Sequence, residues 1–234
     1  RDRSVSRGLG DVYKRQAGIL LKGKAKLNLT VKGDNSLKGT YGGAGIGVEE
    51  KATLIITKES TGSLTATGGG YGAAGIGGRA TVPDYENTII SYKTGTIEIQ
   101  GGNIHAVGGD CWLMGSAVHL GGAGIGTGMY GIGGTVRILG GTVKAEGGRD
   151  TGAGIGGGDN GAVDLIQIGG KNGEAPEVEA SSWNVKYGAA IGSGRNAQFD
   201  LKLSCGTINI FSGNLKVKGC LLYTSPSPRD TERS

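Results

Sequence analysis

One short phrase, Ala-Gly-Ile-Gly, recurs along this chain and restricts its fold more than any other feature of the sequence. Consecutive isoleucines of the phrase are separated by 27, 30, 49, 30 and 36 residues. The copies are Ala44–Gly47, Ala74–Gly77, Ala123–Gly126, Ala153–Gly156 and the variant Ala189–Gly192, preceded by a partial copy at Ala17–Ile19. A phrase that returns at a period of about 30 residues indicates one structural unit stacked on copies of itself.

Short segments in which apolar and polar residues alternate lie between the copies of the phrase. Thr96–Gln100 and Asn103–Val107 alternate apolar and polar residues and are separated by the pair Gly101–Gly102. Thr135–Leu139 and Thr142–Glu146 repeat the pattern. Period-two runs bounded by glycine pairs predict short strands joined by tight turns. Each unit therefore holds three strands, one at the phrase and one at each run.

The high glycine content, 51 of 234 residues, excludes several other architectures when it is combined with this alternation. A collagen helix needs glycine at every third residue and abundant proline, whereas the chain has 4 prolines and no such period. The alternating β-branched residues argue against disorder. No apolar stripe at helical spacing appears, which argues against a solenoid of helices.

Parallel stacking explains the repeat better than hairpins do. Hairpins also use tight turns. They would not, however, place the apolar residues at the same positions in every unit of about 30 residues. A single coil cannot bury its own apolar face, so neighbouring coils must stack. The sequence predicts an all-β parallel β-solenoid of about six coils with three short strands each, and a flat sandwich is the alternative. The predicted core is an inward-facing column of Ile46, Ile76, Ile125, Ile155 and Ile191.

The two ends of the chain are predicted not to belong to the repeat. Residues 6–16 can be encoded by an oligonucleotide whose opposite strand, shifted by one base, encodes residues 220–229. That oligonucleotide also resembles transposase adapter DNA used in sequencing libraries. We therefore expect adapter-derived tails at 1–16 and 220–234, and a repeat domain at 17–219 that is a fragment of a longer protein. The alternative is two natural polar tails.

The charge balance of the repeat domain argues against a nucleic-acid partner. The chain has 25 basic and 20 acidic residues, but seven of the basic and four of the acidic residues lie in the expected tails. The rest is close to neutral and lacks the basic patches interleaved with aromatic residues that single-strand binders use. No membrane span or signal peptide is visible in the sequence. Cys111 and Cys205 can be two buried thiols or a disulfide, and they fix no redox compartment.

The pattern of the units carries a family resemblance. The phrase GAGIGG, followed by the pattern T-x-x-I-x-G-G-T-V-x-A-x-G-G that Thr135–Gly148 carries, resembles repeat regions of large bacterial secreted or cell-surface proteins. The resemblance covers most of residues 17–219. It implies a right-handed parallel β-helix of the pectin-lyase-like kind and a secreted or surface location. Pectin lyases, adhesins and carbohydrate-binding rods share this fold, so the resemblance transfers no catalytic residues.

Three segments resemble chemical sites, but in each case a structural role explains the same residues better. Gly152–Gly157 fits G-x-G-x-x-G, but the residues after it cannot begin the helix that a dinucleotide site needs. Gly157–Gly161 is similar to one calcium-binding nonapeptide, but such sites need tandem copies. Asp150 and Asp159 converge with Arg149 near one phrase, but no spacing forces two carboxylates across a scissile bond. We expect no catalytic residue, metal site or cofactor.

The spacings of 49 and 36 residues between phrase isoleucines contain insertions, which are the most promising binding segments. They are Arg79–Lys93, Asp110–Leu120 and Lys171–Tyr187, and they contain both tryptophans of the chain. Insertions in a solenoid map to loops on one face, which is often the binding face. The alternative is that the rings cover the apolar edge of a coil. The candidate binding residues are Tyr85, Trp112, His119, Trp183 and Tyr187, and three further tyrosines adjoin the phrases at Tyr41, Tyr71 and Tyr130.

These observations favour a non-catalytic module over an enzyme. We expect an adhesive or spacer rod of a secreted or surface protein that binds polysaccharide, such as a host or cell-surface glycan, through loop aromatics. A polysaccharide lyase or glycoside hydrolase of the β-helix kind is the alternative. A groove with two or more carboxylates beside Arg or Lys would favour the enzyme, and exposed aromatics without such a cluster would favour binding. The sequence fixes neither the ligand nor the oligomeric state.

Overall fold

The computed structural model describes residues 16–81, 91–111, 119–171, 173–183, 187–196 and 205–219. Within these ranges the regular structure consists of strands, and no helix occurs. No described segment therefore forms a helix of the length and apolarity needed to cross a membrane. The tails expected at 1–16 and 220–234 lie outside the described residues, apart from Gln16.

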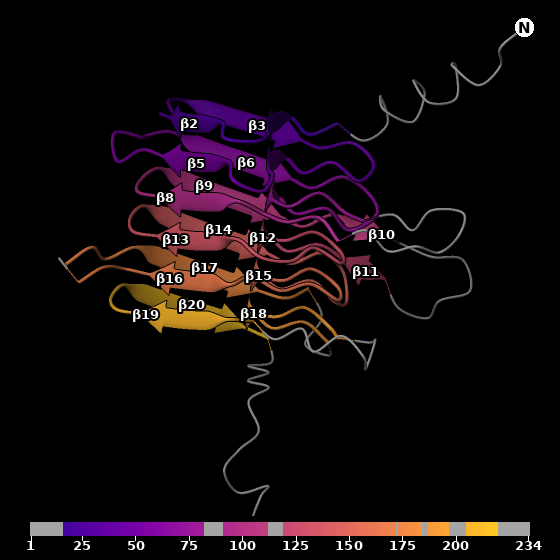
Figure 1. Cartoon of the computed structure of the whole chain (residues 1–234). Helices are drawn as coiled ribbons and strands as arrows, with labels where there is room; N and C mark the ends of the chain where they lie inside the picture. The colour runs from indigo at the N-terminus through magenta and orange to yellow at the C-terminus, as the bar shows by residue number, and fades with distance from the viewer. Residues whose placement is uncertain are drawn as a thin grey trace, which may run out of the picture.

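Three parallel sheets of six strands each run along the molecule (Figure 1). We name the sheets A, B and C, in the order in which the chain passes through them in every coil. Sheet A consists of β1 (Ile19–Leu21), β4 (Ile46–Val48), β7 (Ile76–Gly77), β12 (Ile125–Gly126), β15 (Ile155–Gly156) and β18 (Ile191–Gly192). Sheet B consists of β2 (Lys26–Leu29), β5 (Thr53–Ile56), β8 (Thr96–Ile99), β13 (Thr135–Ile138), β16 (Leu165–Ile168) and β19 (Thr207–Ile210). Sheet C consists of β3 (Asp34–Lys38), β6 (Ser63–Thr67), β9 (Asn103–Val107), β14 (Thr142–Glu146), β17 (Glu177–Ser181) and β20 (Asn214–Lys218). The predicted parallel β-helix of six coils, with three short strands per coil, is confirmed.

The isoleucines of the phrase stack directly on one another in sheet A. Ile125 pairs with Ile76 on one side and with Ile155 on the other, and the register continues to both ends of the sheet. Four of the column residues are completely buried, and the fifth, Ile191, is 5% exposed. Each fully buried isoleucine stabilises the fold by about 1.5–3 kcal/mol relative to an exposed one.

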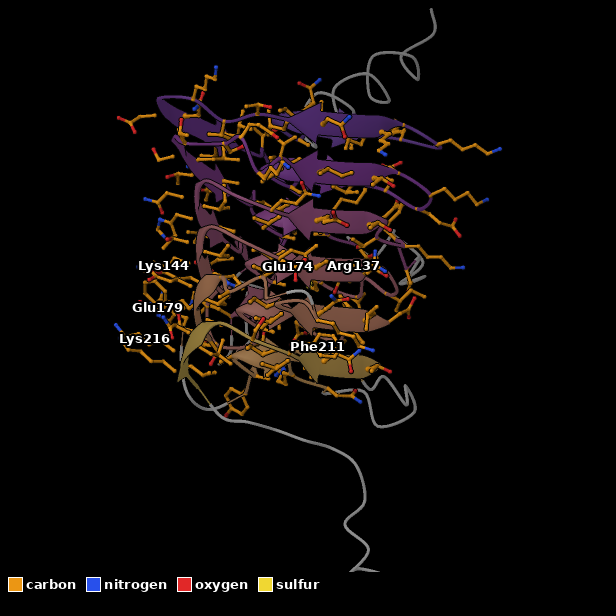
Figure 2. The ribbon with its side chains drawn as sticks, turned by 90° about the vertical axis from the view of Figure 1, so that its left-hand side faces the viewer. Arg137, Lys144, Glu174, Glu179, Phe211 and Lys216 are labelled. Carbon is orange, nitrogen blue, oxygen red and sulfur yellow. The ribbon has the colours of Figure 1, made fainter. Side chains whose placement is uncertain are left out.

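In the four inner coils, sheets B and C bury every second residue, as the alternation in the sequence requires. In β8 the side chains of Ile97 and Ile99 are buried, whereas Thr96 and Glu98 lie on the outer face. The outer face of sheet C carries a column of alternating charge, in which Lys144 pairs in register with Glu179 and Glu179 with Lys216 (Figure 2). Opposite charges on adjacent strands stabilise their pairing modestly.

A tight backbone turn forms at the phrase in the third to sixth coils. The amide of Ala123 donates to the carbonyl oxygen of Thr127 at 3.0 Å, and the corresponding bond joins Ala153 to Gly157 at 2.9 Å. The segments on either side of the phrase therefore approach each other outside sheet A. Their apolar side chains form a second buried cluster of Ala73, Ala80, Cys111, Leu120 and Met129, against which Tyr71 and Tyr130 pack. No periodic pattern in the sequence predicts this second cluster.

Non-glycine residues adopt left-handed backbone conformations at fixed positions around the phrase. Glycine is the residue expected at such corners, since larger residues resist positive φ, and Gly102 and Gly141 of the glycine pairs do adopt positive φ. Around the phrase, the structure also places Tyr41, Tyr71 and Asp150 five residues before a phrase isoleucine, and Lys51, Tyr130 and Asn160 five residues after one, with φ between 49° and 68°. The amides of Tyr71, Tyr130 and Asn160 donate to carbonyl oxygens of the next coil, and these bonds help to hold the costly conformation.

The last glycine of the phrase is required for two reasons. Gly126 has a φ of 138°, and a Cβ atom there would lie 2.0 Å from the carbonyl oxygen of Gly156 in the next coil. We expect Gly126→Ala to lower the free energy of unfolding by at least about 2 kcal/mol, because it adds backbone strain to a steric clash. Chemical denaturation followed by circular dichroism measures this change.

Gly70→Ala is the matched control for this substitution. Gly70 has no positive φ, and a Cβ atom there would meet its nearest neighbours at 3.8 Å, an ordinary contact distance. We expect Gly70→Ala to leave the free energy of unfolding within about 0.5 kcal/mol of the parent value. Equal losses in both variants would contradict the assignment of Gly126 as a close-contact position.

Candidate functional site

The connections between sheet C and sheet A form one continuous side of the molecule, which we call the C–A face. Its described residues are 39–45, 68–75, 108–111, 119–124, 147–154, 182–183 and 187–190. Parallel coils bring the same connection of every coil to the same side, so these segments lie next to one another, on the side of β10 and β11 in Figure 1. The described part of the C–A face carries three of the five predicted binding residues, His119, Trp183 and Tyr187.

The predicted binding residues differ in how well they are placed. Trp183 is 63% exposed and Tyr187 is 38% exposed, so both rings are accessible on the C–A face of the fifth coil. His119 lies on the same face, two coils away. Tyr85 and Trp112 lie outside the described residues. At 63% exposure, the side chain of Trp183 presents most of its surface to solvent.

The insertion that contains Trp112 begins and ends in regular structure rather than in a loop. Its two ends, β10 (Asp110–Cys111) and β11 (Leu120–Gly121), form a short antiparallel pair. Asp110 Oδ1 accepts a hydrogen bond from the amide of Arg149 at 2.5 Å. The sequence predicts a loop over the whole of 110–120, because a two-residue strand pair leaves no periodic signal.

Two tyrosines from neighbouring coils stack on the C–A face. The ring centroids of Tyr41 and Tyr71 are 5.0 Å apart, with an angle of 29° between the ring planes. Tyr41 is 44% exposed, whereas Tyr71 packs against the second apolar cluster. Their equal positions, five residues before a phrase isoleucine, are the sequence signal for this pair.

A shallow groove adjoins the stacked tyrosines and crosses three successive coils. Its volume is about 690 Å³, and it is lined by residues 38–41, 67–70 and 107–110. Glycines form much of its lining, so the backbone is accessible to a ligand. Lys38 and Asp110 provide charged groups, and Tyr41 provides an aromatic ring. The groove therefore offers both polar and aromatic partners to a ligand.

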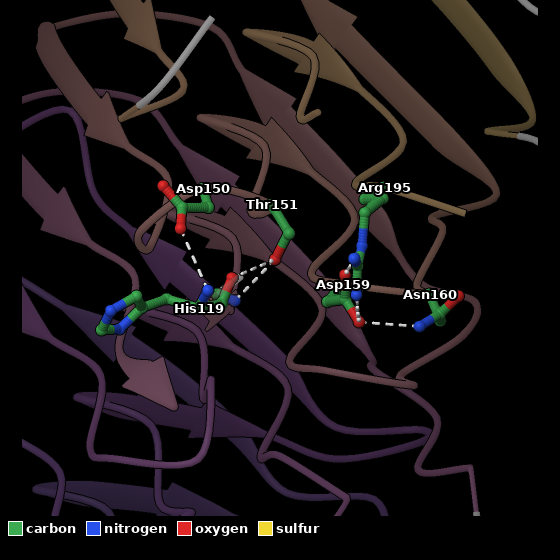
Figure 3. Close-up of polar contacts among 7 residues, drawn as sticks. His119, Asp150, Thr151, Asp159, Asn160 and Arg195 are labelled. Carbon is green, nitrogen blue, oxygen red and sulfur yellow. Dashed lines mark hydrogen bonds and ion pairs between the residues drawn. The ribbon is translucent and has the colours of Figure 1, made fainter. Parts of the chain in front are cut away.

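Polar side chains also gather at a buried ion pair, shown in Figure 3. Asp159 is completely buried, and its carboxylate accepts hydrogen bonds from Arg195 Nε at 2.8 Å and from Asn160 Nδ2 at 2.7 Å. Burial raises the pKa of the Asp159 carboxyl, and the hydrogen bonds and charge of Arg195 oppose this effect. The pair joins the fifth coil to the sixth and has the features of a structural contact.

Asp150 and Thr151 hold the backbone at the end of the third-coil insertion (Figure 3). The amide of His119 donates to Asp150 Oδ2 at 3.0 Å, and the amide of Gly121 donates to Thr151 Oγ1 at 2.7 Å. The sequence places Asp150 and Asp159 with Arg149 around one phrase. In the structure the two carboxylates have different bonding partners: Asp150 accepts from the amide of His119, and Asp159 accepts from Arg195 and Asn160.

The two cysteines of the repeat domain are free thiols. Cys111 is buried and Cys205 is partly buried. Burial raises the pKa of both thiols, and the negative charge of Asp159 raises the pKa of Cys111 further. A raised pKa disfavours the nucleophilic thiolate form. Within the described ranges, no three His, Cys, Asp or Glu side chains are grouped closely enough to bind a metal ion.

Comparison with known proteins gives this chain no family: no family model, curated protein or solved structure matches it.

Proposed function

We propose that this chain is a non-catalytic repeat module of a secreted or surface-attached protein, and that it binds polysaccharide along its C–A face. The observation that carries the proposal is the exposure of Trp183, at 63%, on the same face as the accessible rings of Tyr187 and Tyr41. Large exposed aromatic side chains on one face commonly mark a binding surface. The family resemblance of the repeat supports the extracellular location.

The geometry of the face fits an extended chain of sugars. Sugar rings present flat faces of C–H groups, which stack on aromatic rings, and hydroxyl groups, which bond to backbone amides and carbonyls. The C–A face offers both kinds of partner, because the groove lined by glycines lies beside Tyr41. Parallel coils repeat at about 4.8 Å, so the binding groups of successive coils are arranged along a line. A linear polymer can therefore contact several coils at once.

The contacts of the carboxylates of Asp150 and Asp159 support binding without cleavage. Glycoside hydrolysis needs two carboxyl groups on either side of the scissile bond. Asp159 is enclosed with Arg195, and Asp150 accepts a backbone hydrogen bond at the end of the insertion. We therefore favour binding over the alternative of a polysaccharide lyase or glycoside hydrolase. The parent chain is expected to release no reducing ends or unsaturated products from any polysaccharide that it binds.

Removing the most exposed ring tests the proposed binding surface. We expect the parent chain to bind at least one class of glycan on an array, and Trp183→Ala to weaken that binding about tenfold, because an aromatic contact of roughly 1.5 kcal/mol is lost. Isothermal titration with the glycan identified on the array measures the change. The melting temperature should stay within about 2 °C of the parent value, since the ring is exposed.

Phe211→Ala is the matched control. Phe211 is also an exposed aromatic residue, at 45%, but it follows strand β19 and does not lie on the C–A face (Figure 2). We expect this variant to bind glycan as the parent does. A parent chain that binds no glycan, or an equal loss in both variants, would refute the proposal.

A further inference from the structure

The groove on the C–A face is lined by six glycines, and the packing of the backbone requires five of them. A Cβ atom at any of the five would lie only 1.9–2.4 Å from a carbonyl oxygen, closer than a side-chain carbon can approach. The five are Gly39, Gly68, Gly69, Gly108 and Gly109. A larger residue at these positions would force the backbone apart, so structural stability alone explains why glycine is present there.

Gly70, the sixth glycine of the groove, has no such structural explanation. A Cβ atom there would have the carbonyl oxygens of Tyr41 and Asp110 as its nearest neighbours, both at the ordinary contact distance of 3.8 Å. Gly70 is exposed, and its backbone is not in the left-handed region. Glycine loses more conformational freedom on folding than any other residue, so it destabilises a position that another residue could fill. What glycine provides at this position is open space in the groove.

The equivalent positions in the next two coils carry full-sized side chains. Strands β6, β9 and β14 end at residues that pair in register. The third residue after each strand is Gly70, Asp110 and Arg149, respectively, and all three are exposed. The fold therefore accepts a side chain at this position, and the second coil leaves the corresponding space open.

The open space is wide enough for one sugar ring. The backbones of the first and third coils, which carry Tyr41 and Asp110, are two steps of about 4.8 Å apart, or about 10 Å in total. A ring that makes van der Waals contact on both sides needs about 7–8 Å, since carbon atoms in contact are about 3.5–4.0 Å apart. A single ring therefore fits over Gly70, between these two coils.

Unused hydrogen-bonding groups adjoin this space. Within the described ranges, neither the N–H nor the carbonyl group of Gly70 makes a hydrogen bond. Asp110 accepts a hydrogen bond from the amide of Arg149 through Oδ1, and its Oδ2 has no partner among the same residues. Hydroxyl groups donate and accept hydrogen bonds, so the hydroxyls of a sugar can bond to these groups in place of water.

We infer that Gly70 is the specificity-determining position of the groove, because its missing side chain leaves the space in which one sugar ring of a linear polysaccharide lies against the backbone. Tyr41 and Asp110 border this ring on either side. The inference rests on the proposed function and adds the place in the groove where a sugar residue is held. It also explains why the second coil has glycine where the next two coils have larger residues.

A series of side chains of increasing size at Gly70 tests the inference. The probes are linear hexasaccharides of glucose, galactose, mannose, xylose and galacturonic acid, and the one that the parent chain binds most tightly is used for isothermal titration. Gly70→Ala adds a single methyl group at an ordinary contact distance, so its affinity should stay within about twofold of the parent value. Gly70→Leu fills the space and should weaken binding at least about tenfold.

Thr65→Leu is the matched control for an added leucine. Thr65 lies on the outer face of β6 in the same coil and does not line the groove, so this variant should bind the hexasaccharide as the parent does. Circular dichroism and the melting temperature establish that each variant is folded. If Gly70→Leu is not folded, Gly70→Gln replaces it, because glutamine fills the same space with a side chain that tolerates exposure to water.

The outcome for Gly70→Leu separates this inference from the proposed function. A parent chain that binds none of the hexasaccharides and no glycan on the array would refute both. If the parent binds, Trp183→Ala weakens binding and Gly70→Leu binds as tightly as the parent, the proposed function stands and the assignment of Gly70 is overturned. An equal loss in Gly70→Leu and Thr65→Leu would also overturn it, since the effect would then not depend on the groove.

Discussion

Replacing Ile125 with aspartate is expected to unfold the repeat domain. Ile125 is completely buried, and it pairs with Ile76 and Ile155 in the middle of sheet A. The substitution removes a large apolar side chain from the core, which costs about 2–5 kcal/mol, and places a carboxylate where no cation can reach it. The total loss should exceed about 5 kcal/mol, an amount comparable to the whole stability of many domains. Circular dichroism and thermal melting measure the effect.

Two control variants separate burial of charge from the other consequences of the substitution. Ile125→Val keeps the apolar character and removes one methylene, so it should cost only about 0.5–1.5 kcal/mol. Thr65→Asp introduces the same charge on the outer face of sheet C and should change stability by no more than about 0.5 kcal/mol. An unchanged melting temperature for Ile125→Asp would contradict the inward position of the isoleucine column.

Replacing Arg195 with alanine is expected to have the second-largest effect. The substitution leaves the carboxylate of Asp159 buried without its cation, although Asn160 still donates to it. Removing one partner of a buried ion pair typically costs about 3–5 kcal/mol, because the remaining charge is not compensated. Because the pair joins the fifth and sixth coils, the loss should appear first as weaker protection of the last coil in hydrogen exchange. Denaturant unfolding measures the total.

The pH dependence of this loss identifies its cause. Burial raises the pKa of the Asp159 carboxyl above its ordinary value, so this group favours the folded state in acid and does so less as the pH rises through its raised pKa. Arg195 stabilises only the ionised carboxylate. The destabilisation by Arg195→Ala should therefore be small in acid and increase toward neutral pH.

A neutral partner should rescue the Arg195 variant. Asp159→Asn removes the buried charge but retains a similar shape, so the double variant Arg195→Ala, Asp159→Asn should be more stable at neutral pH than Arg195→Ala alone. Its stability should also be less dependent on pH between acid and neutral conditions. If the single variant loses the same stability at every pH, the packing of the Arg195 side chain, rather than its charge, stabilises the two coils.

The residues of the candidate site divide into those that the sequence could identify and those that it could not. Trp183 and Tyr187 were identified because they lie in an insertion, and insertions between strands of a solenoid must lie on its surface. The stack of Tyr41 on Tyr71 depends on the spacing between two coils, and the sequence showed only that both residues adjoin a phrase. The pairing of Asp159 with Arg195 was not predicted, because the two residues are 36 positions apart and belong to different coils.

By itself the sequence determined the number of coils, the three strands in each, and the side chains that face inward. These features are local and repeated: a two-residue alternation sets the face of every strand, and the phrase sets the register of every coil. Only the tertiary structure decided what lies outside sheet A, including the second apolar cluster, the left-handed tyrosines and the buried ion pair. Those features arise where connections of unequal length from neighbouring coils pack together, and such contacts leave no periodic pattern in the chain.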